Sequence, residues 1–301
     1  MDGLHSRFKK GIHQEDAALV PNLTCSLAYA RPCCQGKGYA FKTGIMFAQA
    51  NICECVLQCK NCRGRSLKVD DFGRARNCVE PAPQMVTNLY NEAKVPTRYF
   101  SASLQGFSNY SGNGREVLGF VQNWLEASKQ KPLRGFILSG AVGVGKTFLL
   151  AALVKALVIR GYSAAFVDFF QLLARLRQAY ADDKSDVSLL QPLLEADVLL
   201  IDELGKGRNT EWELTILDQL VMGRYNANRP IIASTNFSLE DKPIHWDLNK
   251  QLDGDQAMGS GFHDLQFGFL SQRVGPRIYS RLQEMCTLVE LRGENFRTKS
   301  L

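Results

Sequence analysis

One short stretch of the chain, GAVGVGKT, has the spacing G-x-x-x-x-G-K-[ST] of a loop that cradles nucleotide phosphates. Backbone N–H groups around 143–145, with the N-terminus of the next helix, are expected to hold the β-phosphate. Lys146 then reaches the β- and γ-phosphates, and Thr147 ligates Mg²⁺. The loop that we predict to bind nucleotide consists of Gly140, Ala141, Val142, Gly143, Val144, Gly145, Lys146 and Thr147. Such a loop alone does not distinguish a motor from a kinase, a switch or a loader.

A second chemical feature is an acid pair at the end of an apolar run, VLLIDE. Asp202 is expected to hold Mg²⁺ through water, and Glu203 to orient and polarise the attacking water. On its own such a pair is often a helix N-cap. Placed 56 residues after Lys146, it favours hydrolysis over phosphorylation of a small molecule.

Two polar features lie further along the chain. The apolar run IIASTN ends on Asn236, whose amide is predicted to lie beside the γ-phosphate, although an Asn here also suits a turn. Arg273, Arg277 and Arg281 are spaced four apart, which predicts one arginine stripe on a helix face. That stripe would face solvent, a nucleic acid or the γ-phosphate bound to a neighbouring subunit.

These residues need a scaffold, and short apolar runs alternate with helical patterns across the second part of the chain. Strands alternating with helices predict an α/β fold, a parallel sheet with helices on both faces. The stretch 241–270 has no clear period and is expected to be a long loop or insertion. The expected strands are 135–140, 163–169, 196–203 and 230–236, and the expected helices are 147–161, 170–183 and 212–226.

Cysteines are concentrated in the first part of the chain, where eight of the nine precede residue 80. This segment ends near PAPQ, which predicts a Cys-rich zinc-knuckle module over 1–84 and a nucleotide-binding domain over 85–301. The N-terminus lacks the apolar segment of a secretion signal, so the cytoplasm is expected and disulfides are not the first expectation. No run of about 18 apolar residues occurs, so no membrane span is predicted.

Closely spaced thiols suggest a zinc-ribbon-like module. Tetrahedral zinc takes four ligands, commonly in two pairs. Neither possible set is a clean pair of C-x-x-C motifs, because Arg31 stands where a cysteine before Cys34 is expected. Unligated thiols are the alternative. The candidate ligands form two clusters, Cys34 with Cys53 and Cys55, and Cys59 with Cys62 and Cys78. Cys33 is a further candidate ligand.

The basic surplus is also N-terminal, since residues 1–80 hold 12 Lys and Arg against 7 Asp and Glu. The remaining residues hold 24 against 23. A modest basic excess is typical of a nucleic-acid partner, and equally of a solvated basic surface.

The order GAVGVGKT, VLLIDE, STN and GPRIYSRL resembles the AAA+ ATPases of the DnaC/DnaI helicase-loader type and the related IstB transposition helpers. The resemblance covers about 95–297 and implies ATP and Mg²⁺ as cofactors. It implies that Arg281 acts in trans as an arginine finger, with Arg277 one turn earlier as a supporting residue.

The resemblance also implies partners. It places single-stranded DNA contacts on the helix over 169–180, where Phe169 and Phe170 stack on bases and Arg175 and Arg177 face phosphates. The alternative is an amphipathic core helix. The implied function is a DNA-replication factor that self-associates in the ATP state and binds single-stranded DNA or the replicative helicase. The alternatives are a transposition helper that coats duplex DNA and a non-catalytic zinc-binding adaptor.

Overall fold

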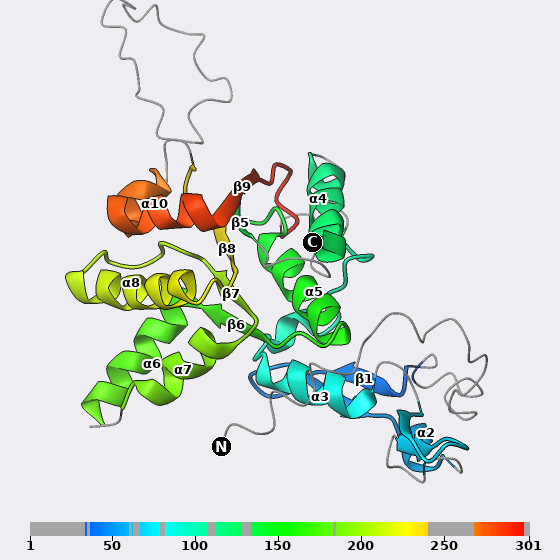
Figure 1. The fold of residues 1–301 in the computed structure, drawn as a ribbon. Coiled ribbons are helices and arrows are strands. Elements are labelled where there is room, and N and C mark those ends of the chain that lie inside the picture. Colours follow the sequence, from blue (N-terminus) through cyan, green and yellow to red (C-terminus); the bar gives the residue numbers. More distant parts are fainter. Residues whose placement is uncertain are drawn as a thin grey trace, which may run out of the picture. The chain divides into compact units, whose positions relative to one another are not determined.

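The computed structural model describes residues 34, 37–59, 62, 67–78, 82–107, 112–127, 134–182, 185–239 and 268–297. They fall into two compact units, Met1–Ala40 with Ile52–Gln84, and Phe41–Asn51 with Met85–Leu301. Figure 1 shows the elements of both units. Cys33 and nearly all of the stretch 241–270 lie outside the described residues, so the predictions made for them stay predictions.

The second unit contains a five-stranded sheet in the order β6-β7-β8-β5-β9, and all neighbouring strands are parallel. This confirms the predicted α/β fold. The fifth strand, β9, was not predicted, because it is an edge strand with only one fully buried side chain. The strands are β5 (Gly135–Ser139), β6 (Ala164–Asp168), β7 (Val198–Asp202), β8 (Ile231–Thr235) and β9 (Cys286–Glu290).

Helices cover both faces of this sheet (Figure 1). On one face α5 (Lys146–Ile159) is largely buried, and α4 (Gly114–Ala127) packs Phe120 and Trp124 edge-on against Phe136, with ring centroids 5.3 and 5.5 Å away. Among the described residues, no helix is both long and apolar enough to cross a bilayer. The helices whose apolar side chains form one core with the other face are α6 (Phe169–Ala181), α7 (Val187–Glu195), α8 (Glu211–Asn226), α9 (Leu270–Val274) and α10 (Pro276–Met285).

The remaining elements are short. β1 and β2 form a two-stranded sheet, and β3 and β4 an antiparallel pair. In the first unit, Cys34, Cys55 and Val56 make a small buried cluster, so thiols supply much of what a core of larger apolar side chains supplies elsewhere. The bounds are β1 (Tyr39–Lys42), β2 (Gln49–Ile52), α2 (Glu54–Leu57), β3 (Leu67–Val69), β4 (Ala75–Asn77), α3 (Pro83–Glu92) and the 3₁₀ helix η1 (Thr97–Tyr99).

A buried arginine on α8 joins three segments of the second unit. The Nη1 atom of Arg224 donates to the carbonyls of Leu193 and Ala196 at 2.8 and 2.9 Å, and Nη2 donates to those of Asp197 and Pro230 at 3.2 and 2.8 Å. Burial lowers the pKa of Arg224 to about 9. The side chain therefore supplies donors to carbonyls at the end of α7 and ahead of β7 and β8.

We expect Arg224→Met to lower the free energy of unfolding by about 3 kcal/mol or more, because it leaves several buried carbonyls without donors. Urea denaturation measures the change. Arg175→Met, which alters an exposed arginine on α6, is the matched control and should shift stability by about 0.5 kcal/mol or less. Equal stability of the two variants would contradict the role given to Arg224.

Candidate functional site

The phosphate loop connects β5 to α5, in the order that the motif requires. Its backbone needs glycine at two positions. Gly145 has φ of +102°, in the left-handed region that side chains disfavour. Gly143 has φ of +86°, and a Cβ there would lie 1.9 Å from Oδ1 of Asn295. Glycine is therefore a steric requirement at both positions, of which Gly145 is a fixed position of the motif.

Lys146 begins α5, and only 7% of its surface is exposed. Its Nζ donates to the carbonyls of Gly140 and Ala141 at 2.6 and 2.8 Å. Burial lowers the pKa of Lys146 to about 8, and the nearby charges of Asp202 and Glu203 oppose that shift. Phosphate oxygens are stronger acceptors than carbonyls, so the ammonium can exchange these partners for a nucleotide.

This depressed pKa predicts pH-dependent nucleotide binding. Below pH 8 the side chain is mostly protonated, and above it a proton must be taken up together with the phosphate. The affinity for ATP should therefore fall as pH rises from 7 to 9.5, approaching about tenfold per unit above pH 8. Calorimetry at pH 8.5 in two buffers of different ionisation enthalpy would measure the proton uptake. An affinity that is constant over this range would contradict the prediction.

Asp202 ends β7 and lies beside the start of α5. Thr147 donates its hydroxyl to Oδ1 of Asp202 at 3.1 Å, and the hydroxyl of Ser234 donates to the same oxygen. Burial raises the pKa of Asp202, whereas these two hydrogen bonds lower it. A carboxylate next to a threonine hydroxyl fits the oxygen ligands that Mg²⁺ prefers. The structure thus brings together the two residues that the sequence assigned to this metal.

Ser234 is a site residue that the sequence analysis missed. Its hydroxyl donates to Asp202 and accepts from the backbone N–H of Glu203 at 3.1 Å, and its side chain is buried. Because β7 and β8 are parallel neighbours, this serine faces the acid pair from the adjacent strand. A serine directly after the apolar run IIA of this strand was the available signal. Ser234 therefore positions the carboxylate of Asp202 and the backbone of Glu203.

Glu203 and Asn236 directly follow the adjacent strands β7 and β8, so both lie at the carboxyl edge of the sheet. Glu203 has φ of +57°, a left-handed conformation, and its Oε2 pairs with Nζ of Lys206. The backbone N–H of Lys206 also donates to the carbonyl of Glu203 at 3.0 Å, which closes a tight turn. The catalytic candidate is therefore half-buried and in contact with a cation.

The predicted single stripe of three arginines is wrong. α9 ends at Val274, Gly275 takes φ of +79°, and α10 begins at Pro276. Arg273 therefore lies on a different helix from Arg277 and Arg281, because glycine followed by proline interrupts the helix.

Arg273 instead holds the loop that follows Glu203. Its Nε and Nη2 donate to the carbonyls of Gly205 and Gly207 at 3.2 and 2.5 Å, and its guanidinium lies 5.1 Å from the centroid of the Phe237 ring. This arginine is a positioning residue for the loop.

The two remaining arginines share α10. Arg281 donates from Nη1 to the carbonyl of Arg277 at 3.2 Å and is half-exposed. Arg277 is exposed and lies 3.7 Å from Asp218 of α8. Both guanidinium groups thus lie at the surface, where a second copy can reach them.

A C-terminal segment that carries no recognisable motif lies against the phosphate loop. Leu291 donates its N–H to the carbonyl of Ser139 at 2.7 Å, and Phe296 donates to that of Gly143 at 3.1 Å. The charge of Arg297 contributes to the lowered pKa of Lys146. This contact spans about half of the chain, so no local pattern predicts it.

The helix α6 divides the residues proposed to contact DNA. Phe169 is only 4% exposed and belongs to the core, so its predicted role in base stacking is wrong. Phe170 is 47% exposed, and Arg175 and Arg177 are exposed as well. The alternative prediction, an amphipathic core helix, is confirmed for the leucines of this helix, which are buried.

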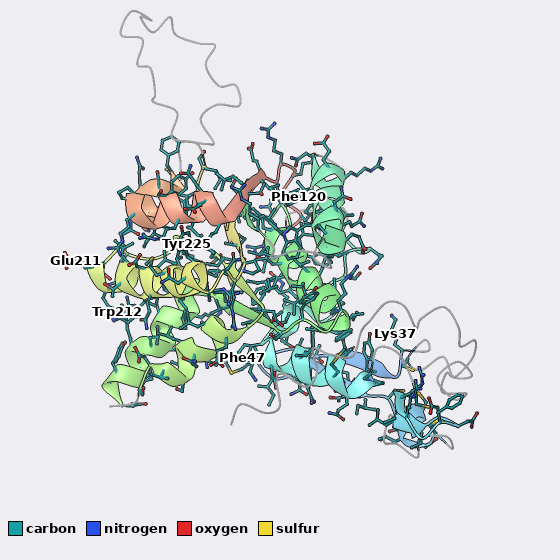
Figure 2. The ribbon with its side chains drawn as sticks, in the orientation of Figure 1. Lys37, Phe47, Phe120, Glu211, Trp212 and Tyr225 are labelled. Atoms are coloured by element: carbon teal, nitrogen blue, oxygen red, sulfur yellow. The ribbon has the colours of Figure 1, made fainter. Side chains whose placement is uncertain are left out.

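An aromatic and cationic surface, defined here as Phe170, Arg177, Tyr180, Lys206 and Trp212, joins α6 to the start of α8. Figure 2 labels Glu211 and Trp212 at that end of α8. The guanidinium of Arg177 lies 5.0 Å from the Trp212 ring, whose centroid is 6.1 Å from that of Tyr180. The ammonium of Lys206 lies 5.9 Å from the Phe170 ring. The exposed rings of Phe170 and Tyr180, interleaved with cations, can stack bases while the cations bind phosphates.

Arg177, the arginine of this surface, is held by a buried glutamate. Arg177 donates from Nη2 to Oε1 of the buried Glu213 at 2.5 Å. The other oxygen of Glu213 accepts from the N–H of Arg208 at 2.8 Å. Glu213 thereby links α6 to the loop that follows Glu203.

In the first unit, six thiols form the two groups that their spacing suggested. One group is Cys34, Cys53 and Cys55, the other Cys59, Cys62 and Cys78, and the ligand atoms of each lie within 4.8 Å of one another. Each group offers three sulfurs from the described residues, whereas tetrahedral zinc takes four ligands.

The electrostatics of the second thiol group, Cys59, Cys62 and Cys78, favour a bound cation. Burial raises the pKa of Cys78, and the adjacent Cys59 and Cys62 raise it further. Sulfurs held this close resist ionisation unless a metal ion compensates their charge. In the first group, Gly38 donates its N–H to the sulfur of Cys34 at 3.3 Å, a contact typical of a thiolate-binding turn.

Comparison with known proteins supplies the family. The family model described as "IstB-like ATP binding protein" matches residues 128–300. "Replicative helicase loader DnaC" of Escherichia coli (strain K12) is 31% identical over 110 residues, 36% of this chain and 45% of that protein. "Replicative helicase loader DnaI" of Bacillus subtilis (strain 168) is 24% identical over 184 residues, 61% of this chain and 53% of that protein. The chain thus spans about half the length of these two relatives.

A solved structure supports the same relationship. "Crystal structure of the DnaC helicase loader" matches with a TM-score of 0.51 at 25% identity, over 65% of this chain and 99% of that one. Sequence and fold therefore agree on the relatives of the nucleotide-binding unit.

Proposed function

Because the chain belongs to the family of IstB-like ATP binding proteins, we propose that it is an ATPase of the helicase-loader type. In this proposal it binds ATP and Mg²⁺ in the cytoplasm, self-associates in the ATP state, and engages the replicative DNA helicase and single-stranded DNA. The observation that carries the proposal is the meeting of Lys146, Thr147 and Asp202 around the phosphate loop, in a chain homologous to DnaC and DnaI.

Each site residue has a distinct role in the proposed hydrolysis. Thr147 and Asp202 would hold Mg²⁺, and the ion would neutralise charge on the phosphate oxygens. Lys146 binds the β- and γ-phosphates. Glu203 orients the attacking water and accepts its proton, while the amide of Asn236 helps to position that water.

Hydrolysis depends on self-association because Arg281 acts on the nucleotide of a neighbouring copy. A guanidinium from a neighbouring copy stabilises the charge that develops on the γ-phosphate during transfer. The half-exposed position of Arg281 on α10 supports this role. Hydrolysis in this proposal needs two copies, so the rate per copy rises with protein concentration.

Single-stranded DNA is the nucleic acid that the aromatic and cationic surface suits best. The ring of Phe170 is accessible for stacking, and Arg177 is held in place by Glu213. Base stacking on exposed rings is tolerant of sequence, as a factor that acts at many DNA positions requires.

For the N-terminal unit we propose zinc at one or both thiol groups. Metal analysis of the purified protein should find zinc. Cys55→Ser should remove the ion of the first group and Cys62→Ser that of the second, because serine is a poor zinc ligand at neutral pH. Cys286→Ser, which changes the buried thiol of β9, is the control and should retain all zinc. Wild-type protein without zinc would overturn this assignment.

The partner is tested with purified proteins. The replicative helicase of the same organism should be retained on the immobilised chain with ATP and Mg²⁺, and Lys146→Ala should weaken that retention. Retention of a transposase in place of the helicase would favour the transposition helper instead. An ATPase rate that is unaffected by Lys146→Ala would overturn the assigned site.

A further inference from the structure

Lys206 has no role in the proposed hydrolytic mechanism, yet its ammonium contacts Glu203, the proposed catalytic base. We propose that Lys206 is a brake that occupies Glu203 until single-stranded DNA binds at Phe170. This inference rests on the proposed function and names a regulatory step of the same site. Lys206 acts through Glu203 and is a positioning residue in this scheme.

The ion pair between Lys206 and Glu203 is built into the backbone. The N–H of Lys206 donates to the carbonyl of Glu203 at 3.0 Å, which places the two side chains three residues apart across a tight turn. Gly205 occupies that turn with φ of +84°, and a Cβ there would come within 3.1 Å of Leu270. Arg273 binds the carbonyls on both sides of Lys206. The loop therefore holds the ammonium beside the carboxylate.

Pairing with Lys206 opposes catalysis by Glu203. The ammonium of Lys206 binds Oε2, one of the two carboxylate oxygens of Glu203, and competes there with the attacking water. The ammonium of Lys206 also stabilises the charged carboxylate where it is, which favours the present rotamer over one directed at water.

The strength of the pair suits a reversible brake. The side chains of Lys206 and Glu203 are 53% and 30% exposed, so water weakens their attraction. Exposed pairs of this kind shift an equilibrium by about two- to fivefold. A ligand with modest affinity for Lys206 is sufficient to separate it from Glu203.

Phe170 connects the brake to the DNA surface. The Lys206 ammonium lies 5.9 Å from the centroid of this ring, in a cation–π contact. A base that stacks on Phe170 competes for the ring face, and the phosphate attached to it is a second anion for Lys206. Single-stranded DNA therefore offers the cation a partner that replaces the carboxylate, which leaves Glu203 able to act on water.

The test is the steady-state ATPase rate with and without oligo(dT), at a fixed protein concentration. Lys206→Ala should raise the rate without DNA by about two- to fivefold, and added oligo(dT) should then stimulate little further. Lys206→Arg should keep the low basal rate and the stimulation, because arginine retains the cation. Arg208→Ala removes another exposed cation from the same loop and should keep the basal rate of the wild type.

A basal rate in Lys206→Ala that equals or falls below the wild type would overturn the brake, provided that thermal unfolding shows an intact fold. The same assay separates this failure from failure of the proposed function. If Lys146→Ala abolishes the wild-type rate but Lys206 variants change nothing, only the brake is wrong. If the wild type shows no ATPase rate that depends on Lys146, the proposed function is wrong and the brake with it.

Discussion

Glu203→Gln is expected to bind ATP as the wild type does and to hydrolyse it about 10²- to 10⁴-fold more slowly. Glutamine has nearly the same shape, and the backbone N–H that donates to Ser234 remains in place. The amide cannot accept a proton from the attacking water, so the loss falls on turnover. Because Lys146, Thr147 and Asp202 are unchanged, the phosphates and Mg²⁺ keep their proposed ligands.

Two measurements decide this prediction: the dissociation constant for ATP with Mg²⁺, by calorimetry, and the turnover number at saturating ATP. Glu211→Gln is the control, since this glutamate lies at the start of α8 with its side chain exposed (Figure 2). It should match the wild type in both. Turnover within about threefold of the wild type in Glu203→Gln would remove Glu203 from the role of base, since general-base catalysis contributes far more.

Arg281→Ala is expected to lower turnover by about 10³-fold or more, the range that an arginine finger contributes, while ATP affinity is retained. Arg281 lies on α10, and its guanidinium donates to a carbonyl of its own helix. Among the described residues, no ion pair joins Arg281 to a carboxylate. Its guanidinium therefore remains able to contact a phosphate on another copy.

Complementation tests the action in trans directly. Glu203→Gln lacks the base but keeps Arg281, whereas Arg281→Ala keeps the base. When the two inactive variants are mixed, some junctions contain an intact Glu203 site facing an intact Arg281. The mixture should then recover part of the wild-type rate, and recovery should grow with total concentration. A mixture as inactive as its components, or a wild-type rate per copy that is independent of concentration, would contradict the shared site.

Much of the nucleotide site was predictable because its parts are local in the chain. The residues Gly140 to Thr147 form one continuous turn, so their spacing alone carries its geometry. Asp202 ends one apolar strand and Asn236 follows another, and parallel strands bring their carboxyl ends to one edge. The alternation of strand and helix likewise predicted the α/β fold, and the order and spacing of the cysteines predicted which thiols meet.

Other features depended on contacts between distant residues. Ser234 reaches Asp202 only because β8 lies beside β7 in the sheet, an order that spacing does not specify. Phe169 and Phe170 are chemically identical neighbours, and packing of α6 alone decides that the first is buried and the second exposed.

The sequence by itself therefore determined the fold class, the phosphate loop and the candidate acids, since each can be predicted from residue types and their spacing within short stretches of the chain. Only the tertiary structure decided that Arg273 braces the loop after Glu203, that Lys206 pairs with that glutamate, and that Arg297 lies near Lys146. The reason is physical: charges and hydrogen-bond donors act over a few ångströms of space. Chain folding, and not distance along the chain, sets which of them come that close.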